Sequence, residues 1–181
     1  MANTLFVSDL HLSEETAHIE QGFYRFLDNE GEIGRLFLLG DIFEAWIGDD
    51  DDSDLARRFA HALTASAQRG TRIFFTPGNR DFLLGADYLS QFGGTRLEDE
   101  VCVEVAGSQA LLMHGDTLCT DDTDYLKFRA LVHSPQWQAE MLAKPLHERR
   151  ALAQQLRAMS MNAASNKAED IMDVNDLAVE D

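Results

Sequence analysis

Apolar, β-favouring runs alternate with segments of helical periodicity along the first half of the chain. Strands are predicted at residues 5–7, 36–39, 72–76 and 110–113, and helices at residues 14–29, 55–68 and 82–92. In the first helical segment the apolar residues share one face: Ile19, Phe23, Phe26 and Leu27. Strands that alternate with helices favour a parallel sheet covered by helices, so we expect an α/β fold.

Two further stretches refine this prediction. Residues 101–105 alternate in part and predict a half-exposed strand, and Gly107 and Ser108 suit a hairpin turn into the strand at 110–113. This indicates a second, more antiparallel sheet. The four consecutive aspartates at 49–52 predict a solvated loop, because like charges repel, and Ser53 or Asp54 can cap the helix that follows.

Beyond residue 122 the apolar spacing is helical throughout. One face carries Tyr125, Phe128, Leu131 and Val132, and a second carries Leu152, Leu156 and Met159. Pro135 and Pro145 mark helix starts, and Ser165 can cap a last helix. These helices form either a layer packed on the sheet or a lid over the strand ends. We predict a core of residues 1–123 and a helical lid or insertion of residues 124–181.

Four of the strand-like runs end in side chains that bind metals, namely Asp9, His11, Asp41, Asn79 and His114. Asp9 and His11 are two residues apart, which points both to the same side of a strand. Ligands bind beyond the carboxyl ends of parallel strands, so we expect all five side chains to converge. Each alone has an ordinary explanation as a helix cap, a structural histidine or a turn residue. Their occurrence together at four strand ends indicates a metal site.

The donor set predicts two ions rather than one. Oxygen and nitrogen donors without a thiolate suit manganese, iron or zinc. Five ligands exceed the needs of one catalytic ion, so two ions that share a carboxylate fit better. Asp41 is the candidate bridge, because Gly40 beside it lets the backbone approach closely. Such a centre suits an anionic substrate, and Arg80 adds donors that match phosphate geometry.

Composition narrows the class of protein. A net charge of −17 argues against nucleic acid as a partner, because basic patches supply most of that affinity. The apolar runs are too short to cross a bilayer and the first residues lead directly into a strand, so we expect a cytoplasmic protein. Cys102 and Cys119 fit no metal-type spacing and are expected to be reduced thiols. Residues 144–167 carry a net charge of +4, which indicates a solvated helix face, an anionic ligand or an anionic membrane surface.

The motifs Asp9-x-His11, Gly40-Asp41, Gly78-Asn79 and His114-Gly115 resemble the motif series of the calcineurin-like metallophosphoesterases. The resemblance implies a sandwich of two mixed β-sheets flanked by helices, with a dinuclear metal centre. Most members carry histidine after the asparagine, whereas Arg80 stands here. With that departure, residues 43–50, 114–122 and 171–175 are similar to the UDP-2,3-diacylglucosamine pyrophosphohydrolases of lipid A biosynthesis.

This resemblance implies hydrolysis of the pyrophosphate of UDP-2,3-diacylglucosamine to 2,3-diacylglucosamine 1-phosphate and UMP, with two Mn²⁺ ions, by an enzyme peripheral to the cytoplasmic face of the inner membrane. A helical lid would hold the acyl chains. The implied metal ligands are Asp9, His11, Asp41, Asn79 and His114, and the implied catalytic residues are Arg80 and Asp41. The implied substrate-binding residues are Asn79, Arg80, Asp122, Ser160 and Lys167. Ala164 stands where that family has asparagine, so one polar contact is expected to be absent.

The family completes its metal set with a Gly-His-x-His motif, and this sequence stops at Asp181 without one. We therefore expect the chain to be a fragment of a longer product, with an incomplete second sheet, weak metal binding and little activity of its own. Two alternatives stay open: another calcineurin-like phosphodiesterase or phosphatase, and a catalytically inactive truncated form that acts only as a scaffold. The oligomeric state is left open by the sequence.

Overall fold

The computed structural model describes residues 2–164, 171 and 173–180, and the chain divides into two compact units, residues 1–114 and 115–181. This boundary follows contacts within the chain, and the expected division into core and lid at residue 123 stays a prediction. The first unit contains six strands among the residues described. They are β1 (Asn3–Val7), β2 (Ile33–Leu39), β3 (Arg72–Thr76), β4 (Thr95–Arg96), β5 (Glu100–Val105) and β6 (Ser108–Met113).

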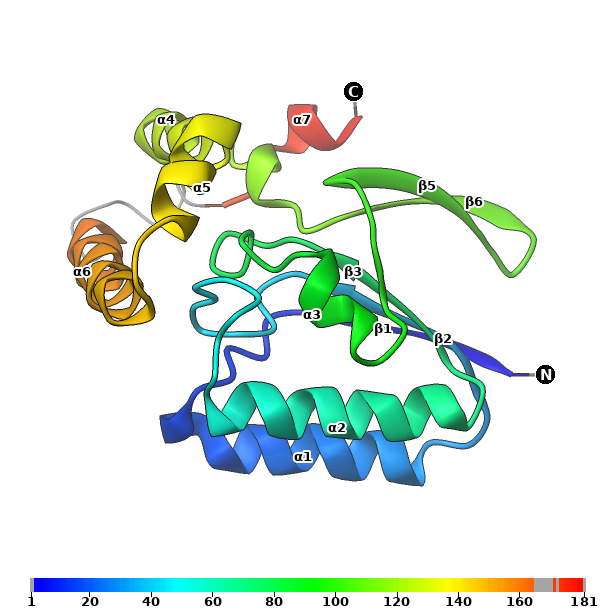
Figure 1. Cartoon of the computed structure of the whole chain (residues 1–181). Coiled ribbons are helices and arrows are strands. Elements are labelled where there is room, and N and C mark those ends of the chain that lie inside the picture. The colour runs from blue at the N-terminus through cyan, green and yellow to red at the C-terminus, as the bar shows by residue number, and fades with distance from the viewer. Residues whose placement is uncertain (1, 165–170, 172, 181) are drawn as a thin grey trace. The chain divides into compact units, whose positions relative to one another are not determined.

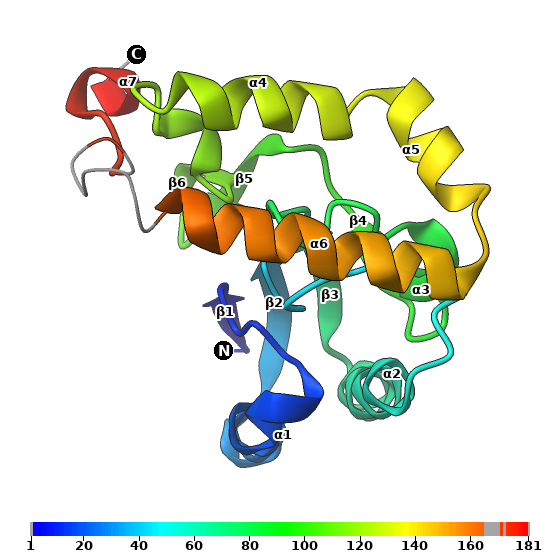
Figure 2. The same ribbon diagram turned by 90° about the vertical axis from the view of Figure 1, so that its left-hand side faces the viewer.

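The first four strands form a parallel sheet in the order β1-β2-β3-β4, which confirms the α/β fold (Figure 1). The short helix η1 (Glu14–Thr16) and α1 (Ala17–Asn29) connect β1 to β2, and α2 (Asp54–Gln68) connects β2 to β3. Both long helices run side by side under one face of the sheet (Figures 1 and 2). Ser53 caps α2, as expected, because its hydroxyl accepts the Ala56 N–H at 3.2 Å.

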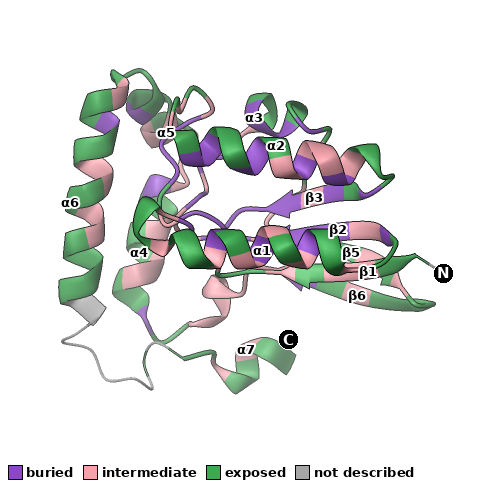
Figure 3. Ribbon diagram, turned by 90° about the horizontal axis from the view of Figure 1, so that it is seen from below, coloured by how far each residue is buried: buried purple, intermediate pink, exposed green. Residues whose placement is uncertain are grey.

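The faces of α1 and α2 that meet the sheet are buried, and their outer faces are exposed (Figure 3). Phe23 and Leu27 of α1 are buried, as are Phe59 and Leu63 of α2, and the rings of Phe23 and Phe59 stack with centroids 5.8 Å apart. Each such side chain contributes about 1.5–3 kcal/mol when it leaves water. The periodicity of the sequence therefore identified the core-facing side of α1.

Strands β5 and β6 form an antiparallel hairpin over the other face of the sheet (Figure 1). Val105 pairs with Ser108, so the turn residues are Ala106 and Gly107, one position earlier than expected. Both have positive φ, 52° and 84°, which is the geometry of a two-residue hairpin loop. The second sheet is antiparallel, as expected.

The predicted helix at 82–92 is wrong in extent, because α3 spans only Ala86–Ser90. The reason lies in the aspartate loop, which is not simply solvated. Asp49 is half-buried and accepts the Gly85 N–H at 2.7 Å and the Tyr88 N–H at 3.0 Å. The carboxylate thereby caps α3 from outside the helix, and the segment before Ala86 forms turns instead.

The second unit is helical among its described residues, as expected. It contains η2 (Asp116–Leu118), α4 (Thr123–Val132), α5 (Pro135–Leu142), α6 (Leu146–Ala164) and α7 (Asp176–Glu180). Pro135 occupies the first turn of α5, and α6 begins directly after Pro145, so both proline predictions are confirmed. Ser165, the expected cap of the last helix, lies outside the described residues.

The structure separates the apolar and basic residues of this unit in a way that the sequence left open. The apolar faces predicted for α4 and α6 are partly exposed, since Phe128, Leu131 and Met159 are 40%, 57% and 66% exposed. Conversely, Arg149 is buried, because its Nε donates to the Lys144 carbonyl at 2.9 Å and ties the start of α6 to the end of α5. In the described part of the chain, no helix combines the length and apolar character needed to cross a membrane.

Candidate metal centre

The loops that follow β1 and β2 leave the same edge of the sheet and pair with each other. Asp9 N donates to the Gly40 carbonyl at 3.1 Å, and His11 N donates to the Asp41 carbonyl at 3.0 Å. Asp9, His11 and Asp41 all adopt left-handed backbone conformations, with φ of 54°, 47° and 53°. Each costs on the order of 1–3 kcal/mol, and such strain clusters at functional sites. The three predicted ligands thus share an unusual, fixed backbone.

Two glycines permit the close approach of these loops to the turn after β3. A Cβ on Gly40 would lie 2.6 Å from Gly78 Cα and 2.8 Å from His114 Nδ1, and one on Gly78 would lie 2.2 Å from Asp41 Oδ1. Neither position has room for a side chain. Asp41 therefore sits directly against the Gly78 turn, where its Oδ1 accepts the Arg80 N–H at 3.0 Å.

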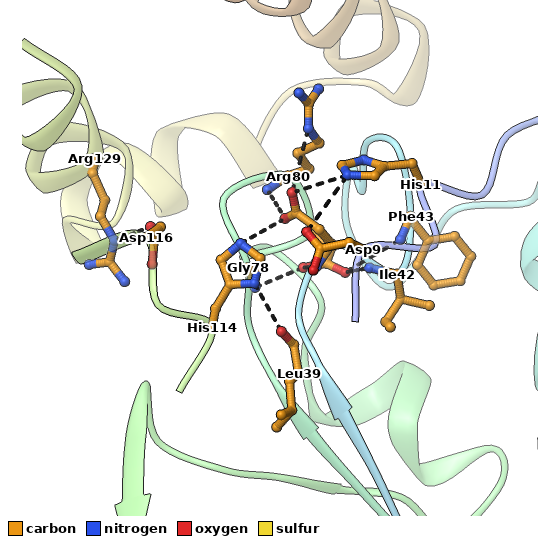
Figure 4. Close-up of polar contacts among 12 residues, drawn as sticks. Asp9, His11, Leu39, Ile42, Phe43, Gly78, Arg80, His114, Asp116 and Arg129 are labelled. Carbon is orange, nitrogen blue, oxygen red and sulfur yellow. Dashed lines mark hydrogen bonds and ion pairs between the residues drawn. The ribbon is translucent and has the colours of Figure 1, made fainter. Parts of the chain in front are cut away.

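The buried Asp41 carboxylate lies between two imidazoles. Its Oδ2 is 3.8 Å from His11 Nε2 and its Oδ1 is 3.7 Å from His114 Nε2. His114 Nδ1 shares a hydrogen bond with the Leu39 carbonyl at 2.9 Å, which turns Nε2 toward Asp41 (Figure 4). One carboxylate that presents an oxygen to each of two histidines is the arrangement needed to bridge two ions.

Asp9 completes the cluster on one side of Asp41. Its Oδ1 is 3.8 Å from His11 Nε2, and one ligand atom from each of Asp9, His11 and Asp41 lies within 4.8 Å of the others. Carboxylate oxygens and imidazole nitrogens without a thiolate fit a borderline-hard divalent ion. Asn79 is half-buried in the turn between Gly78 and Arg80. Its role as a ligand stays a prediction.

Burial shifts the pKa values of two predicted ligands, and both still keep their metal-binding forms near neutral pH. Burial raises the pKa of Asp41 to about 6, although nearby His114 opposes the shift. Burial also lowers the pKa of His11, and the positive charge of Arg80 adds to that effect. At pH 7 the carboxylate is therefore mostly ionised and the imidazole neutral. These are the protonation states that a metal ion requires of its ligands.

Asp81 is a buried residue beside the candidate centre to which the sequence assigned no role. It is completely buried, and its carboxylate accepts the N–H groups of Ile42 at 2.8 Å, Gly78 at 2.9 Å and Asp41 at 3.2 Å. One side chain thus joins the loop that carries Asp41 to the turn that carries Arg80. Burial raises the pKa of Asp81, and its backbone donors oppose that shift. The only signal in the sequence was an acidic residue directly after Arg80.

Glu44 was also missed. Its Oε1 accepts a hydrogen bond from Arg80 Nη1 at 2.8 Å, and its Oε2 is 3.2 Å from His11 Nδ1. Arg80 Nε lies 3.5 Å from Asp41 Oδ2, so the guanidinium of Arg80 is held between two carboxylates beside the predicted metal ligands. Glu44 follows Asp41 by three residues in a loop, and no periodicity pointed it at the centre.

The remaining predicted substrate residues belong to the second unit. Asp122 is 8% exposed and caps α4, because its Oδ1 accepts the Tyr125 N–H at 3.0 Å. Ser160 is exposed on α6, and Lys167 lies outside the described residues. The buried carboxylate of Asp116 binds Arg129 Nε at 2.7 Å and the hydroxyl of Tyr125, which fixes η2 on α4. Substrate contact by Asp122, Ser160 and Lys167 stays a prediction.

Comparison with known proteins agrees with this geometry. The model of the calcineurin-like phosphoesterase family matches residues 2–175. A UDP-2,3-diacylglucosamine hydrolase of Cellvibrio japonicus is 49% identical over 95% of this chain and 72% of that protein. The proteins of the same name from Escherichia coli and Chromohalobacter salexigens are 49% and 46% identical, over 97% and 98% of this chain and 74% and 72% of their own length. The chain therefore belongs to the calcineurin-like phosphoesterases, which are metal-dependent hydrolases, and within them to the family of the UDP-2,3-diacylglucosamine hydrolases.

Proposed function

We propose that this protein hydrolyses the pyrophosphate bond of UDP-2,3-diacylglucosamine with the help of two Mn²⁺ ions. The products are UMP and 2,3-diacylglucosamine 1-phosphate. The observation that carries the proposal is the buried Asp41 carboxylate between His11 and His114, with the Arg80 guanidinium beside it. Proteins named UDP-2,3-diacylglucosamine hydrolase are identical to this chain at almost half of the aligned positions. This identity supports UDP-2,3-diacylglucosamine as the substrate over other phosphate compounds.

The residues present fit a dinuclear centre. Asp9, His11 and Asp41 would hold one ion, and Asp41, Asn79 and His114 would hold the other. When bound, the ions supply a Lewis acid for the phosphoryl oxygens and lower the pKa of water. The protein contributes the fixed geometry of these donors and the exclusion of water by the buried faces of Asp41 and His114, whose side chains are 3% and 8% exposed.

Arg80 would bind the pyrophosphate. A guanidinium matches phosphate oxygens with two parallel hydrogen bonds, and it stays charged at every working pH. The side chain is 26% exposed at the surface of the centre, so it is accessible to a substrate. Unlike a histidine, an arginine does not give up a proton, so Arg80 orients and neutralises the substrate without acting as a general acid.

The helices of the second unit would receive the acyl chains. Large apolar side chains on α4, α5 and α6 are exposed, and they are Phe128, Leu131, Leu142, Met159 and Met161. Each CH₂ moved from water to an apolar surface contributes about 0.8 kcal/mol, so two acyl chains need such a surface outside the bilayer. We place the reaction at the cytoplasmic face of the inner membrane. Exposed basic residues of α6 such as Arg150 would meet anionic headgroups there, whereas the buried Arg149 cannot.

The test measures UMP released from UDP-2,3-diacylglucosamine in detergent, with the Escherichia coli relative as positive control. The protein is used in excess over substrate, so that even a single turnover is detected. We expect release that requires Mn²⁺ and is lost in Asp41→Asn. No release with Mn²⁺, Co²⁺ or Zn²⁺ would refute the proposal. Faster hydrolysis of a simple aryl phosphodiester than of the lipid nucleotide would point to a different phosphodiesterase.

A further inference from the structure

Glu44 connects two parts of the centre that have different tasks. Its Oε1 binds Arg80 Nη1 at 2.8 Å and its Oε2 lies 3.2 Å from Nδ1 of His11, on the ring edge opposite the Asp41 carboxylate. His11 is a predicted metal ligand, and Arg80 is a predicted phosphate-binding group. One carboxylate therefore contacts both with separate oxygens.

We propose that Glu44 is a positioning residue that fixes the metal ligand His11 and the substrate-binding Arg80 in one geometry. The part of this inference that concerns Arg80 rests on the proposed function, whereas the part that concerns His11 needs only a metal. Glu44 touches neither the reacting phosphorus nor, on this geometry, an ion, so its effect passes through its two neighbours.

The carboxylate acts on His11 through the Nδ1 atom. An acceptor near Nδ1 favours the tautomer with its proton there, which leaves the Nε2 lone pair on the side of Asp9 and Asp41. Carboxylates placed in this way behind a ligating histidine fix its ring and raise its basicity, and their loss typically costs about 10–100-fold in metal affinity. With Glu44 in place the Nδ1 atom is buried, so bulk water does not compete with the carboxylate there.

The same carboxylate restrains Arg80. Two carboxylates hold the guanidinium, Glu44 at Nη1 and Asp41 at Nε. Without Glu44, the ion pair with Asp41 would be the one that remains of these two. It would draw the arginine toward the predicted bridging ligand. Arg80 would then compete with the metal for Asp41 and would be misplaced for the substrate. Glu44 thus keeps Arg80 at the rim of the centre.

The backbone delivers Glu44 to this position rigidly. Glu44 N donates to the Leu12 carbonyl at 3.0 Å, and Trp46 N donates to the Arg80 carbonyl at 3.0 Å. The loop that carries Glu44 is therefore tied both to the loop of His11 and to the turn of Arg80. The Glu44 side chain is 19% exposed, so its ion pairs are only partly screened by water.

The experiment compares Glu44→Gln and Glu44→Ala with wild type and with the control Asp49→Asn. Asp49 lies in the same loop region, but its carboxylate binds the backbone of Gly85 and Tyr88 instead. Mn²⁺ affinity is measured by calorimetric titration and by the spin-resonance signal of free Mn²⁺, well below the melting temperature of each variant. The substrate concentration for half-maximal single-turnover rate is measured separately at saturating Mn²⁺.

We expect both Glu44 variants to bind Mn²⁺ about 10–100-fold more weakly and to need more substrate even when the metal is saturating. Asp49→Asn should lower the melting temperature and leave both quantities unchanged. Wild-type Mn²⁺ affinity in Glu44→Gln and Glu44→Ala would overturn the link to His11, and an unchanged half-saturating substrate concentration would overturn the link to Arg80. The Mn²⁺ titration needs no substrate, so it distinguishes a failure of this inference from a failure of the proposed function.

Discussion

Replacing Asp81 with asparagine should destabilise the first unit and disorder the loops that carry the predicted metal ligands. The carboxylate accepts three backbone hydrogen bonds of 3.2 Å or shorter while fully buried. Hydrogen bonds to a charged group contribute about 1.5–3 kcal/mol each. The asparagine oxygen can keep one or two of them, but its NH₂ group then faces an N–H donor. We therefore expect a loss of about 2–4 kcal/mol in the free energy of unfolding.

Urea unfolding followed by tryptophan fluorescence measures this loss. A Trp137→Phe background leaves Trp46 as the reporter, and Trp46 is 3% exposed within the first unit. The matched control is Glu20→Gln, which alters another buried carboxylate in the same unit, bound by Arg58 and Tyr24. Both variants should be destabilised, but only Asp81→Asn should also weaken Mn²⁺ binding. A loss below about 1 kcal/mol would show that the three hydrogen bonds contribute less than typical bonds to a charged group, and the assignment of Asp81 as the link between the loops would fail.

Three further predictions concern a single residue each. Gly40→Ala should lower the free energy of unfolding by about 2–5 kcal/mol, because the φ of 82° is strained for alanine and the Cβ meets Gly78. In the control Gly70→Ala, the φ is 100° but the space around the Cβ is open, so only the backbone strain should lower the free energy of unfolding. Comparable losses for the two variants in urea unfolding would contradict the close approach of Gly40 to Gly78. Hydrogen bonds from Arg58 lower the pKa of Glu20, so this carboxylate adds stability above pH 4.5 that is lost as pH falls below it. Unfolding of Glu20→Gln should therefore depend less on pH in that window, and an unchanged slope would argue against the ion pair. Arg150→Glu should weaken binding to anionic vesicles by about 2 kcal/mol, since it reverses one exposed charge, and it should leave hydrolysis in detergent unchanged. The control is Arg25→Glu on α1. An equal effect of this control on vesicle binding would show that net charge alone is responsible.

The fold was predictable from sequence where one pattern determined one element. The spacing of Phe23 and Leu27 identified the buried face of α1, and Ser53 and Pro135 marked helix starts that the structure confirms. The prediction failed where a distant group intervened. The segment after Phe82 has helical composition, but the Asp49 carboxylate takes the Gly85 and Tyr88 N–H groups and delays the start of α3. An interaction across more than thirty-five residues leaves no local trace in the sequence.

The candidate site divides in the same way. Asp9, His11, Asp41 and His114 could be named in advance, because strand ends of a parallel sheet converge and their chemistry is distinctive. The structure places Asp9, His11 and His114 around the carboxylate of Asp41. Glu44 and Asp81 could not be named, since each depends on which backbone or side-chain groups lie opposite it in space. Arg149 is an error of the opposite kind, because the sequence places it among basic residues expected at the surface. The structure buries it, and its Nε donates to the Lys144 carbonyl.

Asp81, which the sequence did not reveal, explains how the centre tolerates its strained backbone. Three left-handed residues, Asp9, His11 and Asp41, cost on the order of 1–3 kcal/mol each. The hydrogen bonds of Asp81 to the Asp41 loop and the Gly78 turn are of comparable total size and offset that strain before any metal arrives. A site built in this way needs little rearrangement to bind ions. The cost of ordering the ligands is then part of the free energy of folding and does not reduce the metal affinity. Asp81→Asn should consequently lower the Mn²⁺ affinity even under conditions where the protein stays fully folded. That result would distinguish a role of Asp81 in preorganising the site from a role in stability alone.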